Sequence, residues 1–162
     1  MDYSDDLTRT VTARRESLTS ISDADAAKRP SANGWSAKEI IGHLIDSASN
    51  NHQRFVRAQW QDDLIFPGYE QEGWVSAQRY QDADWQELID FWALYNRHLA
   101  RVMEAIPDAI RLRVHTRHNL HQRAWTIVPE GQPTTLDYFM RDYVGHLQHH
   151  LRQLDALRLP TP

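Results

Sequence analysis

The chain has 162 residues and a formal net charge of −4 at pH 7, with 41% hydrophobic and 25% charged residues. That length fits a single domain (1–162) around one core, and no apolar run approaches the ~20 residues needed to cross a bilayer. The acidic balance, without a long basic run, argues against nucleic acid as the main partner. Cysteine is absent, which excludes disulfides, thiolate metal ligands and a cysteine nucleophile. The composition therefore indicates a soluble protein that lies in no membrane.

The first third of the chain is predicted to begin with one helix and a loop. Residues 1–10 are polar and acidic and lack the basic and apolar regions of a secretory signal, which favours a cytoplasmic location. Apolar and small residues recur at a loose helical period over 3–21, and the acidic residues near its start suit a first turn. The segment 22–34 is rich in turn residues and predicts a connecting loop.

A second helix is predicted from Ser36 to about Trp60. Ser36 and Glu39 have the spacing of a capping box, in which each side chain satisfies a free N–H at the helix start. Apolar residues then recur at the helical period, and Pro67 with Gly68 ends any helix. Beside this apolar face the same helix carries a continuous polar stripe, spaced by three or four residues and made of Glu39, His43, Asp46, Ser47, Asn50 and Arg54.

The remaining pattern predicts two more long helices and a small insert. The segment 61–84 is a long connection with a short helix over 74–80, and a third helix follows over 85–106 with alternating spacings of three and four. Short alternations at 112–116 and 125–128 predict a pair of strands. A final helix is expected from Thr134 or Thr135 to a stop before Pro160. The fold predicted is all-α: an antiparallel four-helix bundle with a small irregular or two-stranded insert before the last helix.

Histidines on two of these helices form a candidate metal site. His146 and His150 are one helical turn apart at the edge of the buried seam, where two imidazoles can bind one ion. His43, on the polar stripe of the second helix, is the candidate third ligand. Three histidines leave coordination positions open, which is typical of catalytic zinc, and imidazole also suits nickel and copper. The alternatives are two partly exposed helix residues for the pair and a hydrogen-bonded core histidine for His43.

Neighbouring polar residues are candidates for supporting roles. Asp142 lies one turn before His146, and Asp46 flanks His43, so either carboxylate could accept the second ring N–H of a ligand. Either could equally be a solvated helix charge. Asn50 and Arg54 extend the stripe and could orient an anionic substrate, although Arg54 could instead form a surface ion pair. Three further histidines are predicted to be loop residues without an assigned role: His115, His118 and His121.

Two segments carry a family resemblance. The sequence GWSAKEIIGHL at 34–44, followed by GHLQHH at 145–150, resembles the DinB/YfiT-like superfamily of metal-dependent enzymes, and the resemblance covers essentially the whole chain. It implies an up-down-down-up four-helix bundle with a site for Zn²⁺ or Ni²⁺ at His43, His146 and His150. Relatives include S-transferases that use small thiols such as bacillithiol or mycothiol, a thiol-dependent maleylpyruvate isomerase and a metal hydrolase. Many are dimers, so a homodimer is implied here.

The function predicted is that of a metal-dependent enzyme acting on a small molecule. A three-histidine metal with open positions can activate water or ionise a bound thiol, and a chain without cysteine would take that thiol as a low-molecular-weight co-substrate. The candidates are therefore a small-thiol-dependent S-transferase and a hydrolase, which need the same metal shell. The alternative is a non-catalytic metal- or ligand-binding bundle. A nucleic-acid-associated role is disfavoured by the acidic balance.

Overall fold

The bundle consists of four long α-helices. The computed structural model describes residues 3–158, so Met1, Asp2 and Pro160 lie outside it. The long helices are α1 (Tyr3–Leu18), α3 (Ala37–Arg57), α5 (Trp85–Ala105) and α8 (Leu136–Arg158). The short elements are α2 (Asp23–Ala26), α4 (Gln71–Ala77), the 3₁₀ turn η1 (Tyr80–Asp82), α6 (Asp108–Arg111), β1 (Val114–His115), α7 (Leu120–Arg123) and β2 (Thr134–Thr135).

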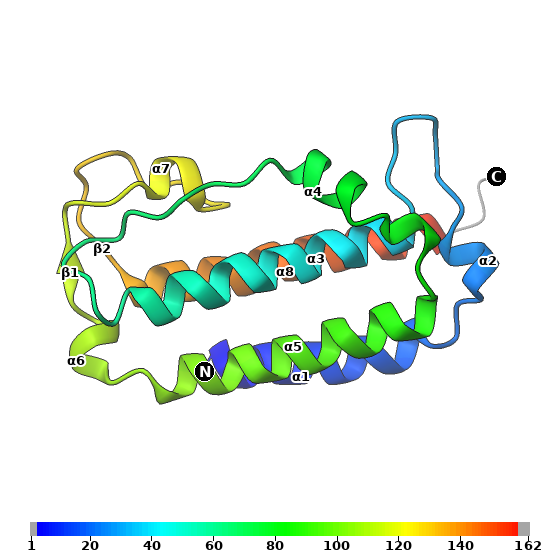
Figure 1. Cartoon of the computed structure of the whole chain (residues 1–162). Helices are drawn as coiled ribbons and strands as arrows, with labels where there is room; N and C mark the ends of the chain where they lie inside the picture. The colour runs from blue at the N-terminus through cyan, green and yellow to red at the C-terminus, as the bar shows by residue number, and fades with distance from the viewer. Residues whose placement is uncertain (1–2, 159–162) are drawn as a thin grey trace.

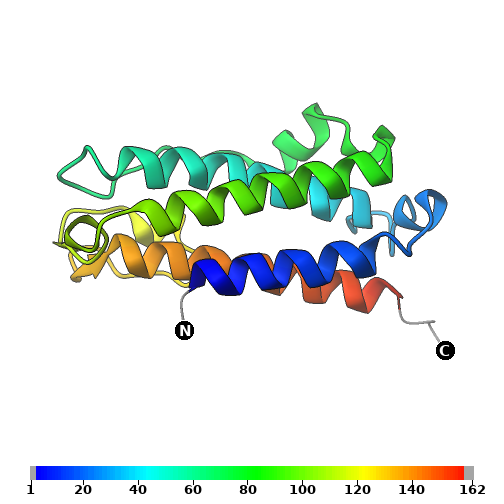
Figure 2. The ribbon, with the colours of Figure 1, turned by 90° about the horizontal axis from the view of Figure 1, so that it is seen from below.

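The helices run up, down, down and up. Figure 1 shows α3 running opposite to α1, α5 running in the same direction as α3, and α8 returning in the direction of α1. Each long helix packs against two others, α1 and α3 both against α5 and α8, and Figure 2 shows the same arrangement from below. Because α3 and α5 are parallel neighbours, the chain must travel the length of the bundle between them. The long connection 58–84 makes that crossing, and the topology is the one that the resemblance implied.

The core lies between the four apolar faces. Large side chains with no more than 2% exposure come from all four long helices, among them Leu7 of α1, Phe55 of α3, Trp92 of α5 and Phe139 of α8. The Phe55 and Phe139 rings meet edge to face at 5.8 Å between centroids. Burying each such side chain stabilises the fold by about 1.5–3 kcal/mol. No helix of the described part is long and apolar enough to span a membrane.

The capping box predicted at the start of α3 is present. The Ser36 side chain accepts a hydrogen bond from the Glu39 amide at 3.3 Å, and the Glu39 carboxylate accepts one from the Ser36 amide at 2.9 Å. The Ser36 hydroxyl also donates to the Gln81 side chain at 2.7 Å, which ties the helix start to the long connection. The same residue therefore fixes both where α3 begins and where the segment before α5 lies.

Replacing Ser36 with alanine is expected to destabilise the protein by about 1–2 kcal/mol, because a buried cap and a link to Gln81 are lost together. Urea unfolding of both proteins measures the difference. The matched control is Ser22→Ala, since Ser22 is an exposed cap of the one-turn helix α2 and its loss should cost about 0.5 kcal/mol, the low end for a cap. Equal effects of the two substitutions would contradict the role given to Ser36.

The strand pairing differs from the prediction. β1 pairs antiparallel with β2, so that Val114 faces Thr135 and His115 faces Thr134, and 125–128 is not a strand. The backbone N–H groups of Trp125 and Thr126 are instead bonded to the Asp142 carboxylate. Apolar residues alternate in both 112–116 and 125–128, but only the first segment has backbone N–H and C=O groups free to pair with another strand. The short helix expected over 74–80 is present but lies three residues earlier, as α4, and the turn η1 follows it.

Candidate metal centre

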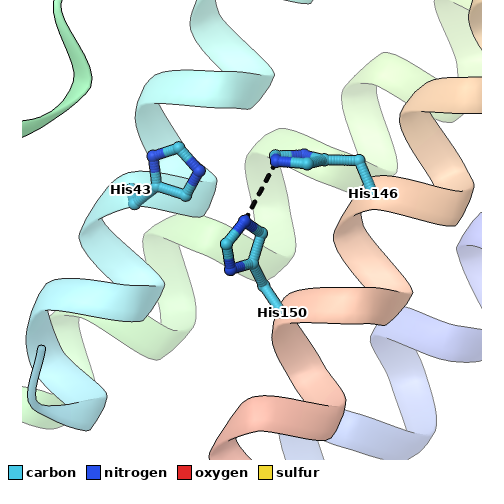
Figure 3. Close-up of side chains that lie close together, drawn as sticks. All are labelled: His43, His146 and His150. Atoms are coloured by element: carbon cyan, nitrogen blue, oxygen red, sulfur yellow. Dashed lines mark hydrogen bonds between the residues drawn. The ribbon is translucent and has the colours of Figure 1, made fainter. Parts of the chain in front are cut away.

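Three histidines from two neighbouring helices converge at one point. His43 lies in the second turn of α3, while His146 and His150 lie one turn apart on α8, which runs antiparallel beside it. Figure 3 shows the three imidazoles pointing toward one another across the gap between the helices. The helix period explains this arrangement, since residues four apart on α8 project from one face toward α3.

The distances among the rings suit one shared ion. Ring centroids lie 5.4 Å apart for His43 and His146, 4.7 Å for His43 and His150, and 4.5 Å for His146 and His150. One nitrogen from each ring can be chosen so that all three lie within 4.8 Å of one another. The two Nε2 atoms of α8 are 3.0 Å apart. Ligands of one tetrahedral ion with bonds of ~2.05 Å are ~3.3 Å apart, so the spacing of this pair fits.

His43 is the most informative member of the group. Its side chain is fully buried, and neither ring nitrogen has a hydrogen-bond partner among the described residues. The Trp35 ring packs against it at 5.1 Å between centroids and offers no acceptor to a buried N–H. Burying an unsatisfied polar group costs about 1–3 kcal/mol. A metal ion would give one of these nitrogens the partner that it lacks.

All three imidazoles are neutral at pH 7. Burial, with repulsion from His150 second, lowers the pKa of His43 to about 4. Burial, followed by repulsion from the other histidines, lowers the pKa of His146 to about 3. Burial also lowers the pKa of His150, against a bond with Gln153 that raises it. A neutral imidazole has a free lone pair, which is the form that binds a metal.

Polar neighbours orient the two histidines of α8. The Nδ1 atom of His150 lies 2.8 Å from the Gln153 side-chain oxygen, and because an amide oxygen only accepts, Nδ1 carries the proton and Nε2 keeps its lone pair. The Nδ1 atom of His146 lies 3.4 Å from the Ser47 hydroxyl. Both Nε2 atoms therefore face the centre. Three neutral nitrogen donors match zinc and related divalent ions.

The two carboxylates expected near these rings have other partners. Asp142 accepts the amides of Trp125 and Thr126 at 2.8 and 2.7 Å. Asp46 accepts hydrogen bonds from the side-chain amide of Gln78 at 2.6 Å and from the Tyr80 hydroxyl at 2.7 Å. Burial raises the pKa of both carboxyls. Where carboxylates were expected to orient the imidazoles, the structure places Ser47 and Gln153, and both acids hold loops against the bundle instead.

A polar pocket of about 170 Å³ opens beside the centre, on the side of His146. Its walls are formed by α3, the long connection, α7 and α8, and include Ser47, Arg54 and Tyr69. Arg54 is 6% exposed and lines the pocket, as expected of a substrate-binding candidate. Asn50 is not part of the lining, and its amide donates to the Asp46 carbonyl. Arg123 of α7 also lines it, although nothing in its sequence surroundings marked it.

The remaining candidate histidines stand apart from the centre. His115 and His118 are each 5% exposed and bond to the backbone carbonyls of Asp62 and Gln132, so they hold the insert in place. His121 is part of α7 rather than of a loop. His149, by contrast, borders the centre, because its ring lies 5.3 Å from that of Trp125 and 5.4 Å from that of His150 between centroids.

Comparisons with known proteins agree with this fold. A family model described as the DinB superfamily matches residues 6–154. A protein of Halalkalibacterium halodurans named "putative metal-dependent hydrolase" is 22% identical over 168 residues, covering 94% of this chain and 82% of that protein. The solved structure of YfiT from Bacillus subtilis, titled "a probable metal-dependent hydrolase with an unusual four-helix bundle topology", superposes with a TM-score of 0.71 at 17% identity. The match covers 95% of this chain and 85% of that one, and it shows the shared fold.

Proposed function

We propose that this chain, which belongs to the DinB superfamily, is a metal-dependent hydrolase of a small molecule, with a divalent ion held by His43, His146 and His150. The observation that carries the proposal is the buried His43 ring, whose two nitrogens have no partner among the described residues and which faces two further neutral imidazoles. The names of the two similar proteins support the choice of hydrolysis.

The residues around the site divide the work of the proposed reaction. A bound divalent ion supplies a Lewis acid that lowers the pKa of water and polarises a substrate oxygen. Ser47 and Gln153 hold the imidazoles of α8 so that Nε2 is the donor atom. Three protein ligands leave a position for water or substrate. The pocket that opens at His146 gives the substrate its route, and Tyr69 and Phe139 are among its walls.

Transfer of a small thiol is the second candidate. Two observations favour it. The chain contains no cysteine of its own, and a metal ion bound by the three histidines would ionise a thiol that is added as a co-substrate. Assays of zinc-loaded protein on a panel of esters, amides and thiol acceptors, each with and without a thiol, separate the two reactions. Hydrolysis without thiol supports the hydrolase, and turnover only with thiol supports the transferase. No turnover in any arm of the panel would leave a non-catalytic metal-binding bundle. The choice of Zn²⁺ or Ni²⁺ and the homodimer stay predictions.

Metal binding should raise the melting temperature of the metal-free protein. A ligand that binds only the folded state at 100 times its Kd adds about 2.7 kcal/mol of stability, which corresponds to a rise of roughly 5–10 °C for a domain of this size. The measurement is thermal unfolding of chelator-treated protein with added Zn²⁺ or Ni²⁺. Mg²⁺ is the control, because it prefers oxygen ligands. An equal response to Mg²⁺, or none to any ion, would contradict the proposed centre.

A further inference from the structure

Two guanidinium groups share the pocket with His146. Arg54 comes from the last turn of α3 and Arg123 from the last residue of α7. Burial lowers the pKa of Arg54, the interaction with Tyr69 opposes that shift, and repulsion from Arg123 adds to it. Like charges in a shared wall destabilise the fold unless something compensates them.

Among the described residues, no carboxylate neutralises this pair. Within residues 3–158, no carboxylate lies within 4.0 Å of either guanidinium, and both donate only to neutral acceptors. Arg54 bonds the Asn51 side chain at 3.3 Å and the Pro67 carbonyl at 3.1 Å, while Arg123 bonds Gln122 at 3.2 Å. The Nε atom of Arg123 is buried without a partner in the described part of the chain.

The acidic side chain that lines the pocket is already hydrogen-bonded to the backbone. Asp142 is the one acidic residue among the lining residues of the described chain, and its two oxygens accept the amides of Trp125 and Thr126. Those bonds to backbone N–H groups use the carboxylate to hold the loop. A buried charge is usually paired with an opposite charge. The two guanidinium groups of this pocket can therefore pair with an anion that comes from outside the described chain.

The long connection shapes this wall. The Pro67 carbonyl holds Arg54, and the next residue, Gly68, lies directly under the guanidinium of Arg123. A Cβ atom at position 68 would lie 2.2 Å from Nη1 and 2.6 Å from Cζ of Arg123. The absence of a side chain at Gly68 therefore lets Arg123 approach the pocket beside Arg54.

We infer that Arg54 and Arg123 form an oxyanion subsite, which binds a carboxylate or phosphate group carried by the substrate. This inference rests on the proposed function, because it names the substrate class of the same pocket. Arg54 is seven residues along α3 from Ser47, whose hydroxyl contacts His146. Seven residues of helix rise by ~10 Å, so the backbone of Arg54 lies about that far along α3 from Ser47. The proposed substrate is a small anionic molecule whose negative group binds at Arg54 and Arg123 in the pocket that opens beside His146.

Isothermal titration calorimetry with succinate, inorganic phosphate and neutral succinamide tests the subsite. Metal-free and zinc-loaded wild-type protein should both bind at least one anion and should not bind succinamide. A charged hydrogen bond contributes about 1.5–3 kcal/mol, so Arg123→Gln should weaken anion binding about 10- to 100-fold. Tighter binding of succinate identifies a carboxylate, and tighter binding of phosphate identifies a phosphate.

Two further variants separate binding from folding. Gly68→Ala displaces the flexible end of Arg123, so it should weaken anion binding with little change in melting temperature. Arg117→Gln removes the same charge from an exposed residue outside the pocket and should change nothing. Equal affinity in Arg123→Gln and wild type, or no anion binding at all, would overturn the subsite. Anion binding in a protein that binds no zinc would instead refute only the proposed metal function.

Discussion

Replacing His43 with leucine is expected to abolish tight metal binding while leaving the metal-free protein at least as stable as wild type. His43 is fully buried with two unpartnered nitrogens, so an apolar side chain at this position removes an unsatisfied polar group from the core. Such a group costs about 1–3 kcal/mol, which the substitution can recover. The metal affinity should fall about a hundredfold or more, because even partners outside the ligand shell contribute 10- to 100-fold.

Metal titration and urea unfolding of the same two proteins measure both halves of this expectation. The matched control is His98→Leu, which makes the same chemical change on α5 at a half-buried residue outside the three-histidine group, whose ring packs against that of His52 at 5.0 Å between centroids. It should keep wild-type metal affinity. If His43→Leu bound metal as well as His98→Leu, or if it unfolded much more readily than wild type without metal, His43 would be an ordinary structural residue.

Substituting Gly42 with alanine is expected to lower the free energy of unfolding. A Cβ atom at this position would lie 2.1 Å from Cδ2 and 2.2 Å from Cγ of the Tyr80 ring. That ring is held by the hydrogen bond from its hydroxyl to Asp46 at 2.7 Å. Alanine is favoured over glycine in a helix by about 1 kcal/mol, but overpacking of a core costs about 1–3 kcal/mol. Because this clash with a held ring is severe, we expect the upper end of that cost and a net loss of up to about 2 kcal/mol.

Urea unfolding of Gly42→Ala against Gly73→Ala isolates the steric term. Gly73 is exposed in α4, and its added Cβ would meet only the flexible end of Glu70, at 3.1 Å. Alanine there should leave stability unchanged or slightly higher. A Gly42→Ala protein as stable as the Gly73→Ala protein would show that η1 does not press against α3 as closely as described.

Periodicity and capping predicted the long elements because those signals are local. The Ser36 and Glu39 spacing placed the start of α3 at the residue where the structure has it, and the third helix was predicted within one residue of α5. The approach of His43 to His146 and His150 also followed from local rules, since each histidine lies on the inner edge of an amphipathic helix. The parallel run of α3 and α5 came only from the family resemblance.

Features that depend on distant contacts were not accessible in the same way. Alternating residues at 125–128 predict a strand, yet the backbone amides of Trp125 and Thr126 donate hydrogen bonds to Asp142, in the second turn of α8. The same bonds take that carboxylate away from His146. Arg123 belongs to the pocket only because α7 folds back over α3 and Gly68 makes room for it. Each of these contacts joins two segments that are far apart in the sequence, and neither periodicity nor capping predicts which distant segments meet.

X-ray absorption spectroscopy of zinc-loaded protein, combined with metal content per chain, tests whether the three histidines bind one ion. We expect one zinc per chain, with three imidazole nitrogens at ~2.0–2.1 Å and a water or substrate oxygen completing the shell. The three-nitrogen signal should lose one imidazole or vanish in His43→Leu. A wild-type protein that binds no zinc at micromolar concentration, or an ion whose imidazole count is unchanged by His43→Leu, would contradict the metal centre.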